Sequence, residues 1–278
     1  MKKACCSICT ALFFLVSVLP GYSEEADREY IFSVVPQFPA TTIQNNWKPL
    51  LDEVVRVTGY KIGLKFYKSI PEFEQGFLEG VPDFAYMNPY HQVMAAKAQG
   101  YIPLIRDSKE LEGLLVVRKD DTIGSVQELN GKELAFPSPN ALAASLYMRA
   151  LLVGLEHVNF TPNYVKTHSN VYRHVLLGKA AAGGGVNKTL QDEPKELREQ
   201  LRILYKTPGI SSHPISVHPR VSSNVAKAIS EAFIKLAGDP HGRELLREVA
   251  IPEPVMADYE KDYKPLEMLG LEKFDGED

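Results

Sequence analysis

The sequence predicts an α/β protein built as two lobes that are joined by two crossover segments. Strand-like apolar runs alternate with helical stretches from residue 30 to residue 250, which predicts mostly parallel sheets with helices on both faces. A second alternating series begins after Leu114–Arg118, and the chain returns near residues 208–216 to a last strand and two helices. Two crossovers predict a hinge, near residues 117–121 and 208–216, with a ligand cleft between the lobes. One continuous sheet is the alternative.

The first series contains four strands separated by helices. Thr42–Thr58 carries apolar residues at a helical period, among them Trp47, Leu50 and Val54, and Gly59 ends this helix. The strands are predicted at Tyr30–Val35, Lys61–Tyr67, Asp83–Met87 and Tyr101–Ile105. Two further helices are predicted at Ile70–Leu78 and Pro89–Gln99.

The second series follows Leu114–Arg118 and passes through an Asn130-Gly131 turn. Its strands are predicted at Leu134–Phe136, Tyr164–Lys166, Ala180–Ala182 and Arg202–Tyr205. Its helices are predicted at Ala141–Glu156, Asn170–Leu177, after Gly185 and at Lys195–Glu199. The closing elements are a strand at Val217 and helices at Ser223–Ala237 and Gly242–Glu248. Residues 24–118 and 215–278 are therefore assigned to lobe 1, and residues 119–214 to lobe 2.

The first 23 residues are predicted to be a secretory signal peptide. Lys2 and Lys3 precede the apolar run Ala4–Leu19, and Gly21-Tyr22-Ser23 offers small residues for cleavage before Glu24. An uncleaved membrane anchor is the alternative, although the run is short for one. All three cysteines, Cys5, Cys6 and Cys9, lie in this segment, at the wrong end of the apolar run for lipidation. The exported chain would have no thiol, which favours the periplasm as its location.

Composition and charge exclude some partners. The 278 residues are 45% hydrophobic and 24% charged, as in ordinary globular proteins. The net charge is −4, and it becomes −6 without residues 1–23, which hold two lysines and no acids. An acidic surface argues against nucleic acid as a partner. It does not exclude an anionic ligand, because a buried anion is held by local N–H groups.

Two loops at predicted strand ends carry polar side chains suited to a ligand. Ligands of α/β sheets bind outside the carboxyl ends of the strands. The strand at Asp83–Met87 runs into Tyr86, Asn88 and Tyr90, where packing is the alternative role of the two tyrosines. The segment Pro137–Ser145 carries Ser138, Asn140 and Ser145. Its first part, Pro137–Asn140, lies just before the helix predicted at Ala141, whose first N–H groups attract an anion. Helix capping is the alternative role of Ser138 and Asn140.

Three further candidates follow other strands. His168 comes after Tyr164–Lys166 and before a helix, although a lone histidine is often an ordinary surface residue. Asn187 follows the glycines Gly183–Gly185, which would allow close approach of the backbone to a ligand. His213 lies in the return crossover. We therefore predict a ligand site assembled from both lobes.

Catalytic and cofactor motifs are missing from the sequence. It has no H-E-x-x-H and no closely spaced histidine pair, so a zinc site is not expected. It has no G-x-S-x-G nucleophile motif and no pair of carboxylates at strand ends. The glycine run lacks the spacing of nucleotide-binding loops. The sequence thus predicts a binding protein that is not an enzyme and that needs no cofactor.

The order of elements in residues 111–145, strand, crossover, strand and ligand loop, resembles a known family. It is similar to the hinge and second lobe of type II periplasmic solute-binding proteins, in the phosphate/phosphite/phosphonate-binding branch of the ABC importers. The resemblance covers about residues 30–250 and implies the two-lobe periplasmic-binding-protein fold of type II. It also implies an exported protein that binds a small oxyanion by lobe closure and delivers it to an ABC permease of the inner membrane.

The resemblance also bears on the site residues. Relatives usually carry a run such as S-T-S in the loop where this chain has Asn140-Ala141-Leu142-Ala143-Ala144-Ser145. His168 matches a family histidine that meets the ligand. Ser212 and His213 stand where phosphonate-binding relatives tend to have an acid, so the ligand is expected to lack an ammonium group. Two alternatives remain: a periplasmic sensor that presents the same fold to a membrane receptor, and an enzyme on this fold, such as a porphobilinogen-type enzyme.

Overall fold

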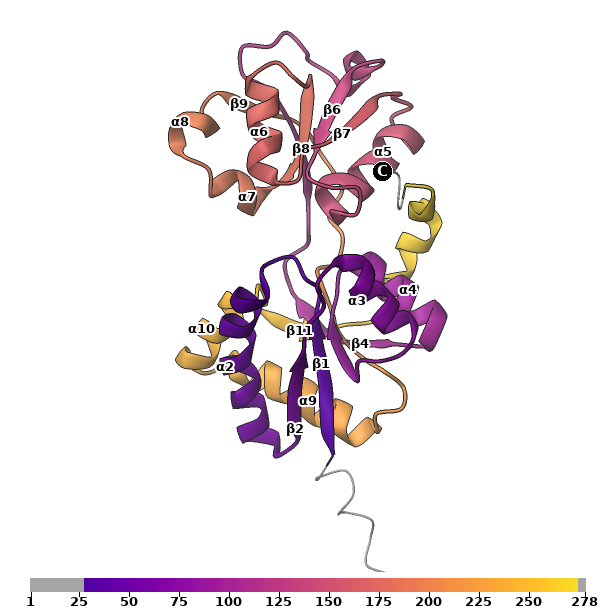
Figure 1. Ribbon diagram of the computed structural model, residues 1–278, viewed down its shortest axis with the longest axis vertical. Coiled ribbons are helices and arrows are strands. Elements are labelled where there is room, and N and C mark those ends of the chain that lie inside the picture. Colours follow the sequence, from indigo (N-terminus) through magenta and orange to yellow (C-terminus); the bar gives the residue numbers. More distant parts are fainter. Residues whose placement is uncertain (1–27, 275–278) are drawn as a thin grey trace, which may run out of the picture.

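The protein consists of two lobes, each built on its own mixed sheet with helices packed against it (Figure 1). The structure, a computed structural model, describes residues 28–274. The strand order is β11-β4-β10-β3-β1-β2 in lobe 1 and β7-β6-β8-β5-β9 in lobe 2. The predicted two-lobe α/β architecture is therefore confirmed. The predicted signal peptide, residues 1–23, lies outside the described residues.

Lobe 1 is formed by two separate parts of the chain. The first part contains β1 (Glu29–Val34), α2 (Ala40–Thr58), β2 (Lys61–Lys65), α3 (Ile70–Leu78), β3 (Phe84–Tyr86), α4 (Pro89–Gln99) and β4 (Ile102–Asp107). The second part contains β10 (Ile215–Val217), α9 (Ser223–Leu236), α10 (Pro240–Glu248) and β11 (Pro254–Met256). Strands β1, β2 and β3 are parallel, whereas β10 and β11 pair antiparallel with their neighbours. Gly59 and Gly100 end α2 and α4 with positive φ angles of 77° and 74°, which glycine adopts readily.

Lobe 2 is formed by the middle of the chain. Its strands are β5 (Gly113–Arg118), β6 (Glu133–Phe136), β7 (Thr161–Tyr164), β8 (Ala182–Val186) and β9 (Leu201–Lys206). Its helices are η1 (Val126–Leu129), η2 (Leu142–Leu146), α5 (Tyr147–Gly154), α6 (His168–Leu176), α7 (Asn187–Gln191) and α8 (Lys195–Arg198). The short helix η1 is a 3₁₀ helix, and η2 is a π turn that runs directly into α5.

The first crossover lies earlier in the chain than the sequence predicted. Strand β5 pairs with β8 and β9, so it belongs to the sheet of lobe 2. The crossover is therefore residues 108–112 rather than 117–121, and the lobe boundary predicted at residue 118 moves to the start of β5. The apolar run fits this place, because an interior strand is covered on both faces. The second crossover, residues 207–214, ends at β10, and Leu111 and Ile210 join the two crossovers with amide-to-carbonyl distances of 2.8 and 3.0 Å.

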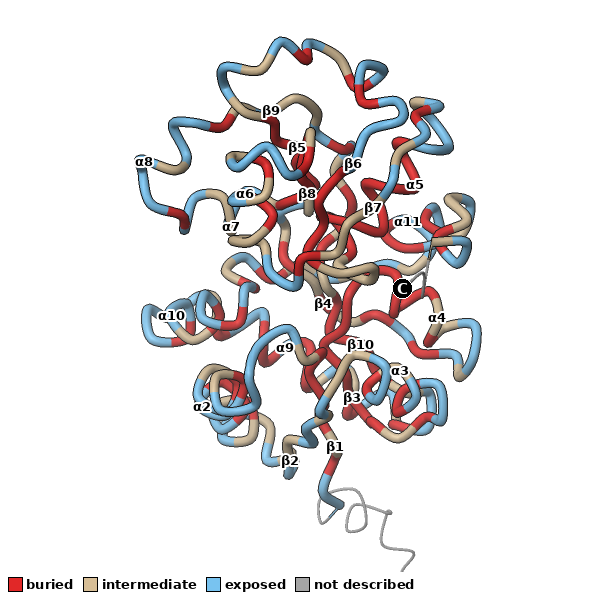
Figure 2. The backbone as a smooth tube through the Cα atoms, turned by 45° about the horizontal axis from the view of Figure 1, so that its top comes forward, coloured by how far each residue is buried: buried red, intermediate tan, exposed pale blue. Residues whose placement is uncertain are grey.

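Each lobe has its own apolar core around its sheet. In lobe 1 the core contains Phe32, Phe84 and Phe233, all fully buried. In lobe 2 Leu115 and Val117 pack on one face of β5, and Val116 packs on the other. Figure 2 shows the strands of the two sheets as the buried centre of each lobe.

The three glycines lie inside strand β8, whereas the sequence predicted a strand at Ala180–Ala182 that ends before them. A methyl group on Gly184 would overlap the carbonyl oxygen of Ala144 in η2 and come within 2.6 Å of Cδ1 of Phe136. On the next strand, Gly113 faces the carbonyl oxygen of Ala143 in the same way. Glycine is therefore required here because the π turn packs directly onto the strand backbones.

Candidate functional site

The carboxyl ends of parallel strands from both lobes point toward the crossovers. In lobe 2, β6, β7 and β8 are parallel, and Val186 at the end of β8 pairs with Gly113, which follows the first crossover directly. In lobe 1, Tyr86 at the end of β3 pairs with Ile215, which follows the second crossover. We call the region between these two edges the interlobe site. It is the position at which α/β sheets bind ligands.

Four predicted residues lie along the lobe 2 edge. Ser138 and Asn140 stand in the loop after β6, His168 opens α6 after β7, and Asn187 opens α7 after β8. Because the strand order is β7-β6-β8, the three loops are neighbours at one edge. Thr167 caps α6 by accepting a hydrogen bond from the amide of Asn170, and the first turn of this helix presents its positive dipole end.

Two polar atoms at this edge are buried without a protein partner. They are Oδ1 of Asn140 and Nδ1 of His168, neither of which has a hydrogen-bond partner among residues 28–274. A 180° rotation of the Asn140 amide would present its NH₂ group at the same place. Burial lowers the pKa of His168 below its ordinary value of 6.5, so its ring is neutral at pH 7. Such groups favour a ligand that brings its own hydrogen-bonding atoms.

Arg149 holds the loop after β6 from inside lobe 2. Its side chain is buried, and its Nε donates to Oγ of Ser145 over 3.2 Å while Nη2 donates to the carbonyl oxygen of Pro139 over 2.9 Å. The guanidinium also lies 5.4 Å from the ring centroid of Tyr164. Ser145 is fully buried in η2, so its hydroxyl holds Arg149 instead of facing the interlobe site as the sequence analysis expected.

The lobe 1 edge presents a stack of rings. The ring centroids of Tyr86 and His213 lie 5.4 Å apart, at an interplanar angle of 27°. The ring of Trp47, which belongs to α2, lies with its centroid 4.8 Å from that of Tyr86. Nε2 of His213 is 3.1 Å from Nε2 of Gln37. Burial, with a smaller contribution from His91, lowers the pKa of His213 to about 3. Burial also raises the pKa of Tyr86, so both rings are neutral at pH 7.

Asn88 and Tyr90 have internal partners. Oδ1 of Asn88 accepts a hydrogen bond from the amide of His91 over 2.7 Å and thereby caps α4, which is the capping role that competes with ligand binding at such positions. Tyr90 is buried in an apolar cluster with Leu146 and Tyr147 of lobe 2. Asn88 therefore caps a helix of lobe 1, and Tyr90 packs between the lobes.

Sequence reasoning missed three residues at or behind the site. Gln37 follows β1, and its place directly after a parallel strand could have identified it. Glu112 lies in the first crossover, 3.3 Å from Nδ2 of the exposed Asn187 and 3.7 Å from Nζ of Lys206. Arg149 had no signal in the sequence, because the carbonyl oxygens of Pro139 and Phe274, to which it donates, are brought to it only by folding.

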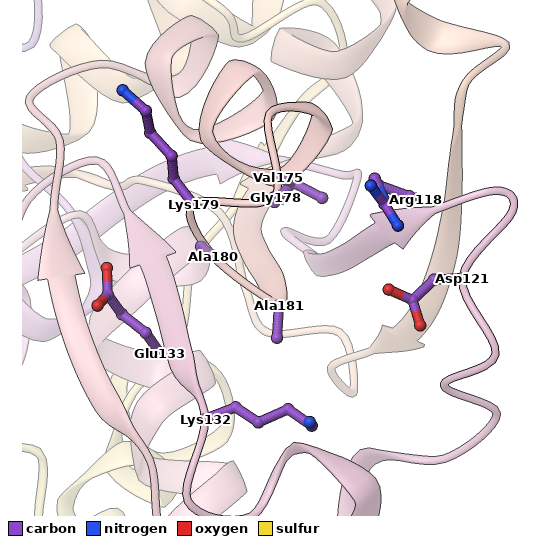
Figure 3. Close-up of a pocket in the computed structure, with 9 residues that line it drawn as sticks. All are labelled: Arg118, Asp121, Lys132, Glu133, Val175, Gly178, Lys179, Ala180 and Ala181. Carbon is purple, nitrogen blue, oxygen red and sulfur yellow. The ribbon is translucent and has the colours of Figure 1, made fainter.

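A separate hollow of about 500 Å³ opens at the other end of lobe 2 (Figure 3). It lies beside the start of β6 and β8, at the opposite end of these strands from the interlobe site. Figure 3 shows Lys132 and Asp121 reaching toward the opening, whereas Glu133 and Lys179 point away from it. Its charges are mixed, and none of the predicted ligand residues contributes to it. The lining residues are Arg118, Asp121, Lys132, Glu133, Val175, Gly178, Lys179, Ala180 and Ala181.

The described part of the chain has neither a metal site nor a membrane-spanning helix. Between residues 28 and 274, no three His, Cys, Asp or Glu side chains are grouped so that they could hold a metal ion. Within the same residues, no helix has the length and apolar character needed to cross a bilayer.

Comparisons with known proteins agree on one family. A family model described as "ABC transporter, phosphonate, periplasmic substrate-binding protein" matches residues 32–263. The phosphonates-binding periplasmic protein of Escherichia coli (strain K12) is 21% identical in an alignment 282 residues long. The alignment covers 95% of this chain and 82% of the relative.

Solved structures share the fold. PhnD1 of Prochlorococcus marinus (MIT 9301), in complex with methylphosphonate, superposes with a TM-score of 0.73 at 15% identity and covers 88% of this chain and 98% of its own. A Xanthomonas citri protein bound to chloride has a TM-score of 0.74 at 18% identity, with the same coverage of both chains. The family consists of binding proteins rather than enzymes, as the sequence predicted. Since the family model matches most of the chain, this protein belongs to the periplasmic substrate-binding proteins of ABC phosphonate transporters.

Proposed function

We propose that this protein binds a small phosphonate without an ammonium group at the interlobe site and delivers it to an ABC permease of the inner membrane. The observation that supports the proposal is the place of strand ends from both lobes beside the crossovers, with Tyr86 at the end of β3 and with Asn140 and His168 shortly after β6 and β7. The methylphosphonate complex of the Prochlorococcus relative supports the ligand class. The lobes would close on the ligand by bending at residues 108–112 and 207–214.

The proposed contacts rely on polar side chains and on helix ends. Ser138, Asn140 and His168 would meet the phosphonate oxygens from lobe 2, with Asn187 at the rim. Tyr86 and His213 would cover it from lobe 1. An anion in a closed site needs several donors, because a buried charge without partners costs several kcal/mol. The first amides of α6 add donors that have no partner within the helix.

A calorimetric titration of residues 24–278 tests the proposed ligand. We expect methylphosphonate to bind to the protein with 1:1 stoichiometry and more tightly than an ω-aminoalkylphosphonate, since Ser212 and His213 stand where an acid would accept the amine. Phosphate and phosphite serve as competing oxyanions of similar size. Absence of binding by all four compounds would exclude an oxyanion function for this site.

The periplasmic location of this chain is part of the same proposal. We expect export to remove residues 1–23, so that the mature protein begins at or near Glu24 and contains no cysteine. The intact mass of protein recovered from the periplasm, together with thiol titration, tests this expectation. Retention of Cys5, Cys6 or Cys9 would contradict it.

Binding is expected to weaken as the pH rises from about 6 to 8. Burial holds the pKa of His168 below 6.5 without ligand, and a neighbouring dianion would raise this pKa in the complex. A group whose pKa is raised by binding contributes its full gain in affinity at pH values below the pKa that it has without ligand. This gain in affinity is lost as the pH rises through the pKa that the group has in the complex.

His168→Gln is the matched control for this pH dependence, because glutamine keeps a hydrogen-bond donor but does not titrate. The ratio of the two affinities at each pH removes the ionisation of the ligand itself. We expect the ratio of wild-type to variant affinity to fall as the pH rises. A constant ratio would show that His168 binds only as a neutral donor.

A further inference from the structure

We propose that the C-terminal segment Asp258–Phe274, which we call the strap, ties the two lobes together and sets their spacing before any ligand binds. The strap contains α11 (Tyr259–Asp262), η3 (Lys264–Leu269) and η4 (Leu271–Lys273). It leaves lobe 1 after β11, and Figure 1 shows it in yellow running beside α4 of lobe 1 to α5 of lobe 2. The chain therefore connects the lobes a third time, in addition to the two crossovers.

The first end of the strap is fixed to lobe 1 and to the second crossover. Oδ1 of Asp262 lies 3.0 Å from Nη2 of Arg106 on β4, and it accepts a hydrogen bond of 3.0 Å from Oγ of Ser211. Burial alone would raise the pKa of Asp262, but hydrogen bonds from Arg106, the Asp258 amide and Ser211 outweigh it and hold the pKa below 3.8. The hydroxyl of Tyr263 donates to the carbonyl oxygen of Ser212 over 3.0 Å.

The middle of the strap completes an apolar cluster that contains residues of both lobes. Tyr90 and Val93 come from α4 of lobe 1, and Leu146, Tyr147 and Leu151 come from η2 and α5 of lobe 2. The strap contributes Tyr263, Leu266 and Leu271, each at most 4% exposed. Moving the lobes apart on this side would expose these side chains to water, so the cluster opposes opening there.

Phe274, the last described residue of the strap, contacts Arg149, which also holds the loop Pro137–Asn140. The carbonyl oxygen of Phe274 accepts a hydrogen bond of 2.7 Å from Nη2 of Arg149, the same atom that donates to Pro139. The Arg149 guanidinium also lies 5.7 Å from the ring centroid of Phe274. The position of the strap and that of the loop Pro137–Asn140 are therefore linked through one side chain.

The distance between the lobes in the ligand-free protein tests the proposal without reference to any ligand. Because residues 24–278 contain no cysteine, Gln44→Cys on α2 and Gln191→Cys on α7 allow a spin label in each lobe. Both positions are exposed, and Figure 1 shows α2 and α7 on the side of the molecule away from the strap. Pulsed electron spin resonance then reports the distribution of distances between the two labels.

Leu271→Asp releases the strap by placing a charge in the cluster, and Met268→Asp is the control, since Met268 is 90% exposed. We expect a shifted and broader distance distribution for Leu271→Asp and an unchanged one for Met268→Asp. If Leu271→Asp does not fold, as judged by circular dichroism, a chain ending at Gly270 is compared with a chain ending at Gly276. An unchanged distribution in the folded release variant would overturn the proposal, and so would an equal shift in the control.

Discussion

Replacing His168 by alanine is expected to weaken the binding of methylphosphonate by a factor of about 10 to 100. Hydrogen bonds to charged groups contribute roughly 1.5–3 kcal/mol, and every 1.4 kcal/mol is a factor of ten in affinity. His168 opens α6 at the lobe 2 edge, and its Nδ1 is buried without a partner among the described residues. Calorimetric titration of the variant and the wild type measures the difference.

His157→Ala is the control for this substitution. His157 is exposed in the loop between α5 and β7, at the end of lobe 2 that lies away from the crossovers. Like His168→Ala, this substitution removes one histidine, but it should leave the affinity unchanged. Equal affinities of His168→Ala and the wild type would remove His168 from the site, and with it the main residue-level link to oxyanion binding.

Replacing Gly184 by alanine is expected to lower the free energy of unfolding by about 3 kcal/mol, the upper end of ordinary overpacking effects. The added methyl group would meet the Ala144 carbonyl oxygen and the Phe136 ring at once. Neither neighbour can move freely, because β8 lies between β6 and β5 in the middle of the sheet. In a domain of this size the loss corresponds to a fall in Tm of roughly 6–12 °C.

Gly154→Ala makes the same chemical change where space is available. A methyl group at Gly154 near the end of α5 would have no atom within 4 Å, and alanine favours the helix by up to about 1 kcal/mol. Thermal unfolding of both variants should therefore show opposite shifts in Tm. A Tm of Gly184→Ala within one degree or so of the wild type would contradict the close packing of η2 on β8.

Hydrophobic periodicity predicted most helices and strands of both lobes, because it depends only on neighbouring residues. The helix predicted at Thr42–Thr58 is α2, and the strand predicted at Leu134–Phe136 is β6. The assignment of β5 to a lobe failed because its apolar sequence is compatible with a strand in either sheet. Only its pairing with β8 and β9 decides between them.

Some residues of the candidate site could be predicted from the sequence and others could not. Tyr86, Asn140 and His168 could be proposed from sequence because each lies at or just after the end of a predicted strand, and parallel strands end at a common edge. The role of Tyr90 could not, since its neighbours Leu146 and Tyr147 belong to the other lobe and only folding brings them near it. Arg149 and Phe274 are 125 residues apart, and nothing local in either segment indicates their contact.

Local sequence accounts for the alternation of strands and helices and for the loops that carry polar residues, and it predicts a segment that would direct export. These features follow from residue periodicity and from backbone preferences of glycine, proline and the capping residues. Folding was needed to show where the chain crosses between the lobes, why β8 needs its glycines and how the strap connects the lobes. Each of these depends on surfaces from distant parts of the chain that fit together, and such fit has no signature within a window of neighbouring residues.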